Sequence, residues 1–177
     1  ISGEAFKSAT NLTTVTFEPN SKLTSIGDQA FSGATELTSI TIPKLVTYIN
    51  GQYMFLGCYK LTNVTFEEPT SLTVILKGMF QQSGLTSITI PNSVTTIGEE
   101  AFSGATDLSY ITIPPSVNNI GNHAFSDATS LTTVSFEGTS QITTIGQGVF
   151  KGTTSLTSIN IPTSVTTIGN AAFSGCT

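Results

Sequence analysis

Side chains able to do acid–base chemistry are few in this 177-residue chain, and their spacing keeps them apart. Glu18, Glu67 and Glu137 occupy one recurring position at the end of a β-like stretch. They belong to repeats that are two and three steps apart, so with strands about 4.8 Å apart we expect separations of roughly 10 and 14 Å. A retaining glycosidase places its two carboxylates about 5 Å apart. We therefore predict no catalytic carboxylate pair and no enzyme.

The single histidine and the two cysteines likewise predict no metal, cofactor or nucleophilic site. His123 lies at a position that takes many residue types, so we expect it to be solvent-exposed and without a ligand. Cys58 and Cys176 share a position that takes small residues elsewhere, and they are five repeats, or roughly 24 Å, apart. A disulfide needs Cα atoms within about 7 Å, so these two cannot pair within one chain.

The composition excludes two classes of partner. Six lysines, no arginine and a net charge of −5 leave no basic surface for a phosphate backbone, so we predict no nucleic acid. No apolar run approaches the roughly 18 residues of a membrane span, so we predict no direct membrane insertion. The chain also begins and ends inside a repeat, so we expect a fragment of a longer chain, whose uncapped ends could stack end to end.

A repeat of 22 to 25 residues runs through the whole sequence and is marked by phenylalanine. We divide residues 1–177 into one leucine-rich repeat domain of seven units and a partial unit, 1–11. The units are 12–36, 37–60, 61–84, 85–107, 108–130, 131–155 and 156–177.

Each unit contains two short β-like stretches, which are Leu-x-x-Ile-x-Ile and Val-x-x-Ile-Gly. Their β-branched and Thr-rich composition favours strands over helices. We expect Gly98 and its equivalents to permit a tight turn. We expect Pro91 and its equivalents to close the first strand, where a missing N–H costs no ladder bond. The Gly-x-x-Ala-Phe segment that follows is too short for a helix, which favours a turn or a 3₁₀ segment.

One unit cannot bury its own apolar side chains, whereas stacked units align Leu on Leu, Ile on Ile and Phe on Phe. We therefore predict a mostly β repeat solenoid: a right-handed leucine-rich repeat superhelix with parallel strands, short turns or 3₁₀ segments, and almost no α-helix.

The pattern LxxIxIPxxVxxIGxxAFxxC resembles the BspA-like, or Treponema-type, leucine-rich repeats over the whole chain, most closely in units 85–107, 108–130 and 156–177. The resemblance implies a secreted or surface-anchored, extracellular protein of host-associated bacteria that adheres to host or microbial surfaces. Three units depart from the pattern because they carry Phe-Glu in place of Ile-Pro and a link longer by two residues. These units are 12–36, 61–84 and 131–155.

The outward positions of the first strands form the first candidate binding surface. Two columns of Thr and Ser run down this face, and Tyr110, Asn63, Thr89 and Thr112 lie in them. Thr stacks well on itself in sheets, so the columns have a purely structural explanation as well. A flat Thr array is also typical of ice-binding proteins, which is a remote alternative. As a binding platform the face would use Tyr110 as its anchor, because aromatic residues dominate interface energetics.

A second candidate patch is the irregular unit 37–60, which contains Tyr48, Tyr53 and Tyr59. We expect these residues to form a local tyrosine cluster. Together the two patches predict a non-enzymatic binding module whose partner is a protein or glycan on another cell or on matrix. The alternative is a structural spacer without a ligand of its own.

Overall fold

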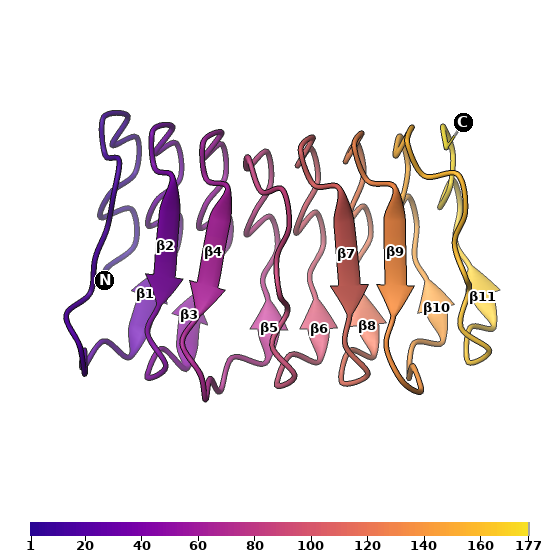
Figure 1. Cartoon of the computed structure of the whole chain (residues 1–177), viewed down its shortest axis with the longest axis horizontal. Helices are drawn as coiled ribbons and strands as arrows, with labels where there is room; N and C mark the ends of the chain where they lie inside the picture. The colour runs from indigo at the N-terminus through magenta and orange to yellow at the C-terminus, as the bar shows by residue number, and fades with distance from the viewer. Residues whose placement is uncertain (177) are drawn as a thin grey trace.

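Successive repeats of the chain lie side by side and wind into a right-handed β-solenoid (Figure 1). The computed structural model describes residues 1–176, and only the backbone of Tyr48 and Asn50. The described residues contain strands and turns and no helix, as predicted.

The two β-like stretches of the units form two rows of parallel strands, which we call the front and back sheets. The front strands are β2 (Ser39–Ile42), β4 (Asn63–Phe66), β7 (Tyr110–Ile113) and β9 (Thr133–Phe136). The back strands are β1 (Ser25–Gly27), β3 (Tyr48–Asn50), β5 (Val74–Ile75), β6 (Thr96–Ile97), β8 (Asn119–Ile120), β10 (Thr144–Ile145) and β11 (Thr167–Ile168).

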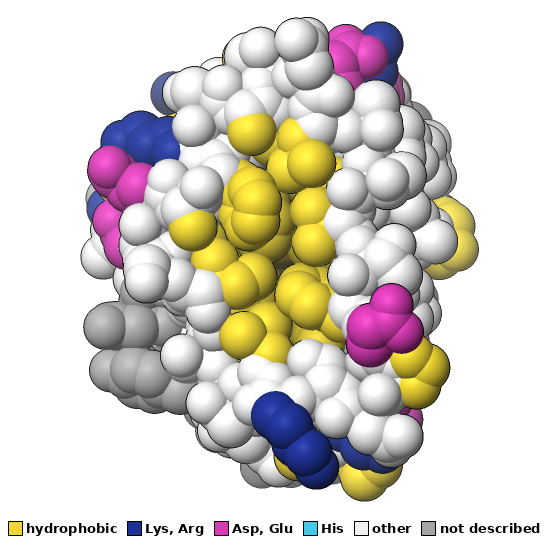
Figure 2. Space-filling model, turned by 90° about the vertical axis from the view of Figure 1, so that its left-hand side faces the viewer, with side chains coloured by type: hydrophobic (Ala, Val, Ile, Leu, Met, Phe, Trp, Pro, Cys, Tyr) yellow, Lys and Arg dark blue, Asp and Glu magenta, His cyan; other side chains and the backbone are white. Residues whose placement is uncertain are grey.

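A continuous apolar core fills the space between the sheets. Eight phenylalanine rings, from Phe6 to Phe173, stack in one column with centroids 5.2–5.7 Å apart. The front strands alternate exposed and buried side chains, so Ile40 and Ile42 face this core while Ser39 and Thr41 face solvent. Viewed from the N-terminal end, the core is an apolar centre inside a polar wall (Figure 2).

The segment around each core phenylalanine forms the third side of the stack, which we call the turn ladder. In every unit that another unit follows, three alternate N–H groups donate to carbonyl oxygens of that next unit, as Glu100, Phe102 and Gly104 do, with N···O distances of 2.7–3.0 Å throughout. All these N–H groups point toward the C-terminal end. The ladder runs without a break from Glu4 to Ser174.

The turn ladder depends on left-handed backbone at two positions of every unit. The first and third donors have positive φ, from 49° at Gln29 to 72° at Gly33 and Gly152. Glycine occupies only some of these positions, and Glu100 and His123 also adopt positive φ, of 56° and 58°. The segment is therefore a turn of alternating handedness, with no 3₁₀ helix among the described residues.

Front and back sheets are hydrogen-bonded at different steps of the stack. The front sheet pairs only β2 with β4 and β7 with β9, while the back sheet pairs β1 with β3, β5 with β6 and β8, and β10 with β11. Each of the six steps between the seven units therefore carries a strand ladder on one side only.

The front sheet is paired only where the next unit carries Phe-Glu. There the N–H of Glu67 donates to the Ile42 carbonyl oxygen (2.9 Å), and that of Glu137 donates to Ile113 (3.0 Å). Proline in the Ile-Pro units has no N–H to make this bond. The prediction that Pro91 and its equivalents cost no ladder bond is therefore wrong.

Three first stretches that we predicted as strands are not strands in the structure. Residues 12–17 make one isolated bridge, between Thr14 and Ser39, and residues 85–90 and 156–161 have no strand pairing. The longer link of the Phe-Glu units goes with a loss of pairing in the back sheet, whereas Phe-Glu itself goes with pairing in the front sheet. After β4 this link runs sideways along the stack before β5 begins (Figure 1), and β3 and β5 are not paired.

The glycine after the second strand is required for close packing rather than for a tight turn. Gly98 and Gly121 do not have positive φ, and a Cβ on Gly98 would lie 2.7 Å from the backbone nitrogen of Lys77 in the preceding unit. Unit 61–84 has Leu76 at this position, and its back strand is the one that fails to pair with β3.

Candidate functional site

The front sheet presents most of the predicted binding residues on one face. Tyr110 is the first residue of β7 and is 52% exposed. Asn63, the first residue of β4, and Thr89, on the unpaired stretch between them, are exposed, and Thr112 is half-buried. The structure therefore brings these four residues to one region of the stack.

Two adjoining hollows lie in this region, on either side of the unpaired stretch 87–90. Their volumes are about 340 and 330 Å³, and both are lined by Glu68, Ser87, Ile88, Thr89 and Pro91. We call the pair the front hollow. Its other lining residues are Asn63, Val64, Thr65, Phe66, Ile90, Asn92, Tyr110, Thr112, Pro114 and Glu137.

The front hollow exists because the main chain of Ser87–Ile90 is not part of the sheet. Among the described residues, no backbone–backbone hydrogen bond joins Ser87–Ile90 to either neighbouring unit. Such groups need a partner, which is water on an open face. The columns of Thr and Ser cross this unpaired stretch, to which they contribute Ser87 and Thr89.

The charge of the front hollow is negative. Glu68 and Glu137 line it, and its lining contains no lysine or histidine. One Glu68 oxygen accepts the Thr70 N–H at 3.0 Å. Among the described residues, no group of three His, Cys, Asp or Glu side chains is placed to hold a metal ion.

The predicted tyrosine patch is spread over the unit rather than gathered. Tyr53 has positive φ on the turn ladder, and its ring lies where a side chain on Gly78 would be. Tyr59 is 61% exposed and lines a separate hollow of about 480 Å³ with Gln82, Gly84 and Asp107. The side chain of Tyr48 lies outside the described residues.

His123 has a structural role that the sequence did not reveal. We expected a solvent-exposed side chain at a position that takes many residue types. The residue instead has left-handed backbone and is half-buried, and its ring lies over the backbone of Gly148. Only a glycine in the next unit leaves room for this ring.

The two cysteines are free, as predicted. Cys58 is buried and its thiol donates to the Phe31 carbonyl oxygen at 3.1 Å. Desolvation raises the pKa of this thiol to about 12, so it is not a nucleophile at neutral pH. Cys176 is partly exposed and lies 3.1 Å from the Thr153 hydroxyl.

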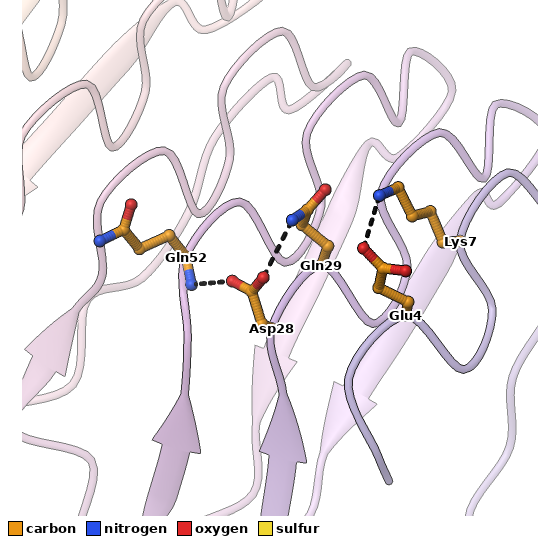
Figure 3. Close-up of polar contacts among 5 residues, drawn as sticks. All are labelled: Glu4, Lys7, Asp28, Gln29 and Gln52. Carbon is orange, nitrogen blue, oxygen red and sulfur yellow. Dashed lines mark hydrogen bonds and ion pairs between the residues drawn. The ribbon is translucent and has the colours of Figure 1, made fainter.

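Polar side chains near the first repeats support the turn ladder (Figure 3). Asp28 accepts the Gln52 backbone N–H at 2.6 Å and the Gln29 side-chain amide at 2.9 Å. The Gln52 bond is the main reason that the pKa of Asp28 lies below its usual range. Glu4 and Lys7 form an exposed ion pair alongside, at 2.6 Å.

A family model of the BspA type leucine-rich repeat region matches residues 1–105 and 73–177, with six copies. The chain belongs to the BspA-type leucine-rich repeat family. The family's leucine-rich repeat domains are typically protein-binding modules. Among curated proteins, none matches this chain.

Solved structures share the fold of this BspA-type domain. A leucine-rich repeat protein of Treponema pallidum is 29% identical, with a TM-score of 0.79 over 90% of this chain and 72% of that one. A leucine-rich cell surface protein of Faecalibacterium prausnitzii is 28% identical, with a TM-score of 0.56 over 98% of this chain and 60% of that one. The pneumococcal vaccine antigen PcpA, at 22% identity and a TM-score of 0.50, shares the fold over 90% of this chain and 53% of its own.

Sequence reasoning missed the hollow itself and two of the residues that line it, Glu68 and Asn92. The sequence does contain a signal for the hollow, which is the irregular alternation of Phe-Glu and Ile-Pro units. The front sheet is unpaired between each Ile-Pro unit and the unit before it. Two Ile-Pro units, 85–107 and 108–130, follow one another, so two adjacent steps of the front sheet are unpaired and the front hollow extends over both.

Proposed function

We propose that this chain is a non-enzymatic binding module of a secreted or surface-anchored protein, and that it adheres to proteins or glycans on host or microbial surfaces. The observation that carries the proposal is the front hollow, where an exposed aromatic residue, Tyr110, lies beside unpaired main chain. Aromatic residues supply much of the energy of binding interfaces. The F. prausnitzii relative is a cell surface protein, which supports an extracellular location. None of the described residues forms a helix that is long and apolar enough to cross a membrane.

The test is binding of the purified chain to whole cells and to a panel of purified extracellular matrix proteins and glycans. We expect saturable binding that Tyr110→Ala weakens at least about tenfold, the loss typical of an anchor residue. Tyr59→Ala is the comparison variant, because it removes a tyrosine of similar exposure from the second candidate patch, and we expect it to weaken binding less than Tyr110→Ala. A structural spacer would show no saturable binding to any of these, and that result would contradict the proposal.

A further inference from the structure

The front hollow combines three features that select one kind of partner. We infer that it receives an arginine side chain from a basic polypeptide segment. This inference rests on the proposed binding function and names the chemistry of the partner.

The first feature is uncompensated negative charge. The ion pairs of the described residues join Lys7, Lys44, Lys60 and Lys77 to Glu4, Glu67, Glu36 and Glu99, respectively. Glu68 and Glu137 have no such partner among the described residues, although both line the hollow. A cationic group entering the hollow would be the first counter-charge that these carboxylates meet.

The second feature is the exposed ring of Tyr110, which lines the same hollow. A guanidinium over the face of an aromatic ring is attracted by the ring quadrupole. The carboxylates and the ring therefore favour the same charge.

The third feature is the main chain of Ser87–Ile90, which lines the hollow and whose carbonyl oxygens accept no backbone hydrogen bond from the neighbouring units. A guanidinium carries five N–H donors in a planar fork, so it can reach a carboxylate and a carbonyl at once. A lysine ammonium is a compact point charge with three donors. A hollow lined by both main-chain carbonyl oxygens and carboxylates therefore favours arginine over lysine.

The experiment is an NMR titration of the ¹⁵N-labelled chain with the peptide Ac-Gly-Arg-Gly-Arg-Gly-NH₂. The comparison peptide has citrulline, a neutral isostere, in place of both arginines. We expect shift changes gathered at Ser87–Asn92 and Tyr110, and affinity for the arginine peptide at least about five times that for the citrulline peptide. Glu68→Gln and Glu137→Gln should each weaken the arginine peptide about three- to fivefold, as expected for exposed ion pairs.

The matched control is Glu100→Gln, which makes the same change of charge on the turn ladder and should leave the affinity unchanged. Equal binding of the two peptides, equal effects of Glu68→Gln and Glu100→Gln, or shift changes elsewhere would each overturn the inference. If the chain binds a surface through Tyr110 but shows no preference for the arginine peptide, the inference about arginine is wrong and the proposed function still stands.

Discussion

At the residue scale, the solenoid depends on positions that require a particular backbone conformation rather than a particular type of side chain. Phe102 and its equivalents were predictable, because apolar side chains at a fixed period reveal a core. The left-handed positions were not, because Glu100 and His123 do not reveal positive φ in a sequence. A residue with a Cβ is strained there by about 1 kcal/mol, and hydrogen bonds of the turn ladder hold it in place.

Replacing Glu100 tests this strain directly. Glycine normally destabilises a regular element relative to alanine, but at φ 56° it relieves the Cβ strain. We expect Glu100→Gly to be more stable than Glu100→Ala by about 1 kcal/mol, measured by urea unfolding. Equal stability, or the usual order with alanine ahead, would show that the ladder does not impose this backbone.

Asp28 predicts a pH dependence of stability. Its folded pKa is below the ordinary value of 3.8, because the carboxylate accepts the Gln52 N–H. The stabilisation is therefore complete above the unfolded pKa and is lost as the pH falls through the folded pKa.

The matched variant is Asp28→Asn, since Asn122 accepts the Gln147 N–H in the equivalent position at 3.0 Å. Urea unfolding between pH 6 and pH 2 should show a smaller loss of stability on acidification in Asp28→Asn than in the parent chain. The same slope in both would mean that the carboxylate contributes nothing.

At the element scale, the Phe-Glu and Ile-Pro units differ in one hydrogen bond, and that bond decides where front strands form. The sequence predicted two strands per unit from composition and alternation. It did not predict that residues 85–90 would stay unpaired, because pairing depends on the N–H of the residue that follows the strand in the next unit. The turn ladder holds every step, so a unit can lose one strand pairing and remain in the stack.

Removing a proline from one unit and introducing one in another tests whether this hydrogen bond decides where front strands form. Pro91→Ala supplies the missing N–H opposite the Phe66 carbonyl oxygen, so we expect the amide protons of Phe66 and Thr89, which would join the two units, to exchange at least about tenfold more slowly. Glu67→Pro should do the reverse and expose the amides that join β2 to β4. The measurement is hydrogen exchange followed by NMR. Unchanged exchange in both variants would contradict the role of this hydrogen bond.

At the scale of the whole molecule, the solenoid is one core with apolar side chains at both ends. Ile1, Leu12 and Phe17 pack only partly against the core at one end, and Ile161 and Ile168 are exposed at the other. We predict that a polypeptide of these 177 residues associates end to end as its concentration rises. Sedimentation velocity should show this association in the parent chain and less of it in Ile168→Lys; association at the same concentration in both would point to another interface.

The central claim is that the front hollow is an opening in the sheet and binds a partner. Binding of the Pro91→Ala variant, to whichever surface or peptide the parent chain binds, tests this claim most directly. We expect that the variant keeps its fold, gains protected amides at Phe66 and Thr89, and binds at least about tenfold more weakly, the loss typical of a residue central to an interface. Full binding by a variant whose amides are protected would contradict this claim.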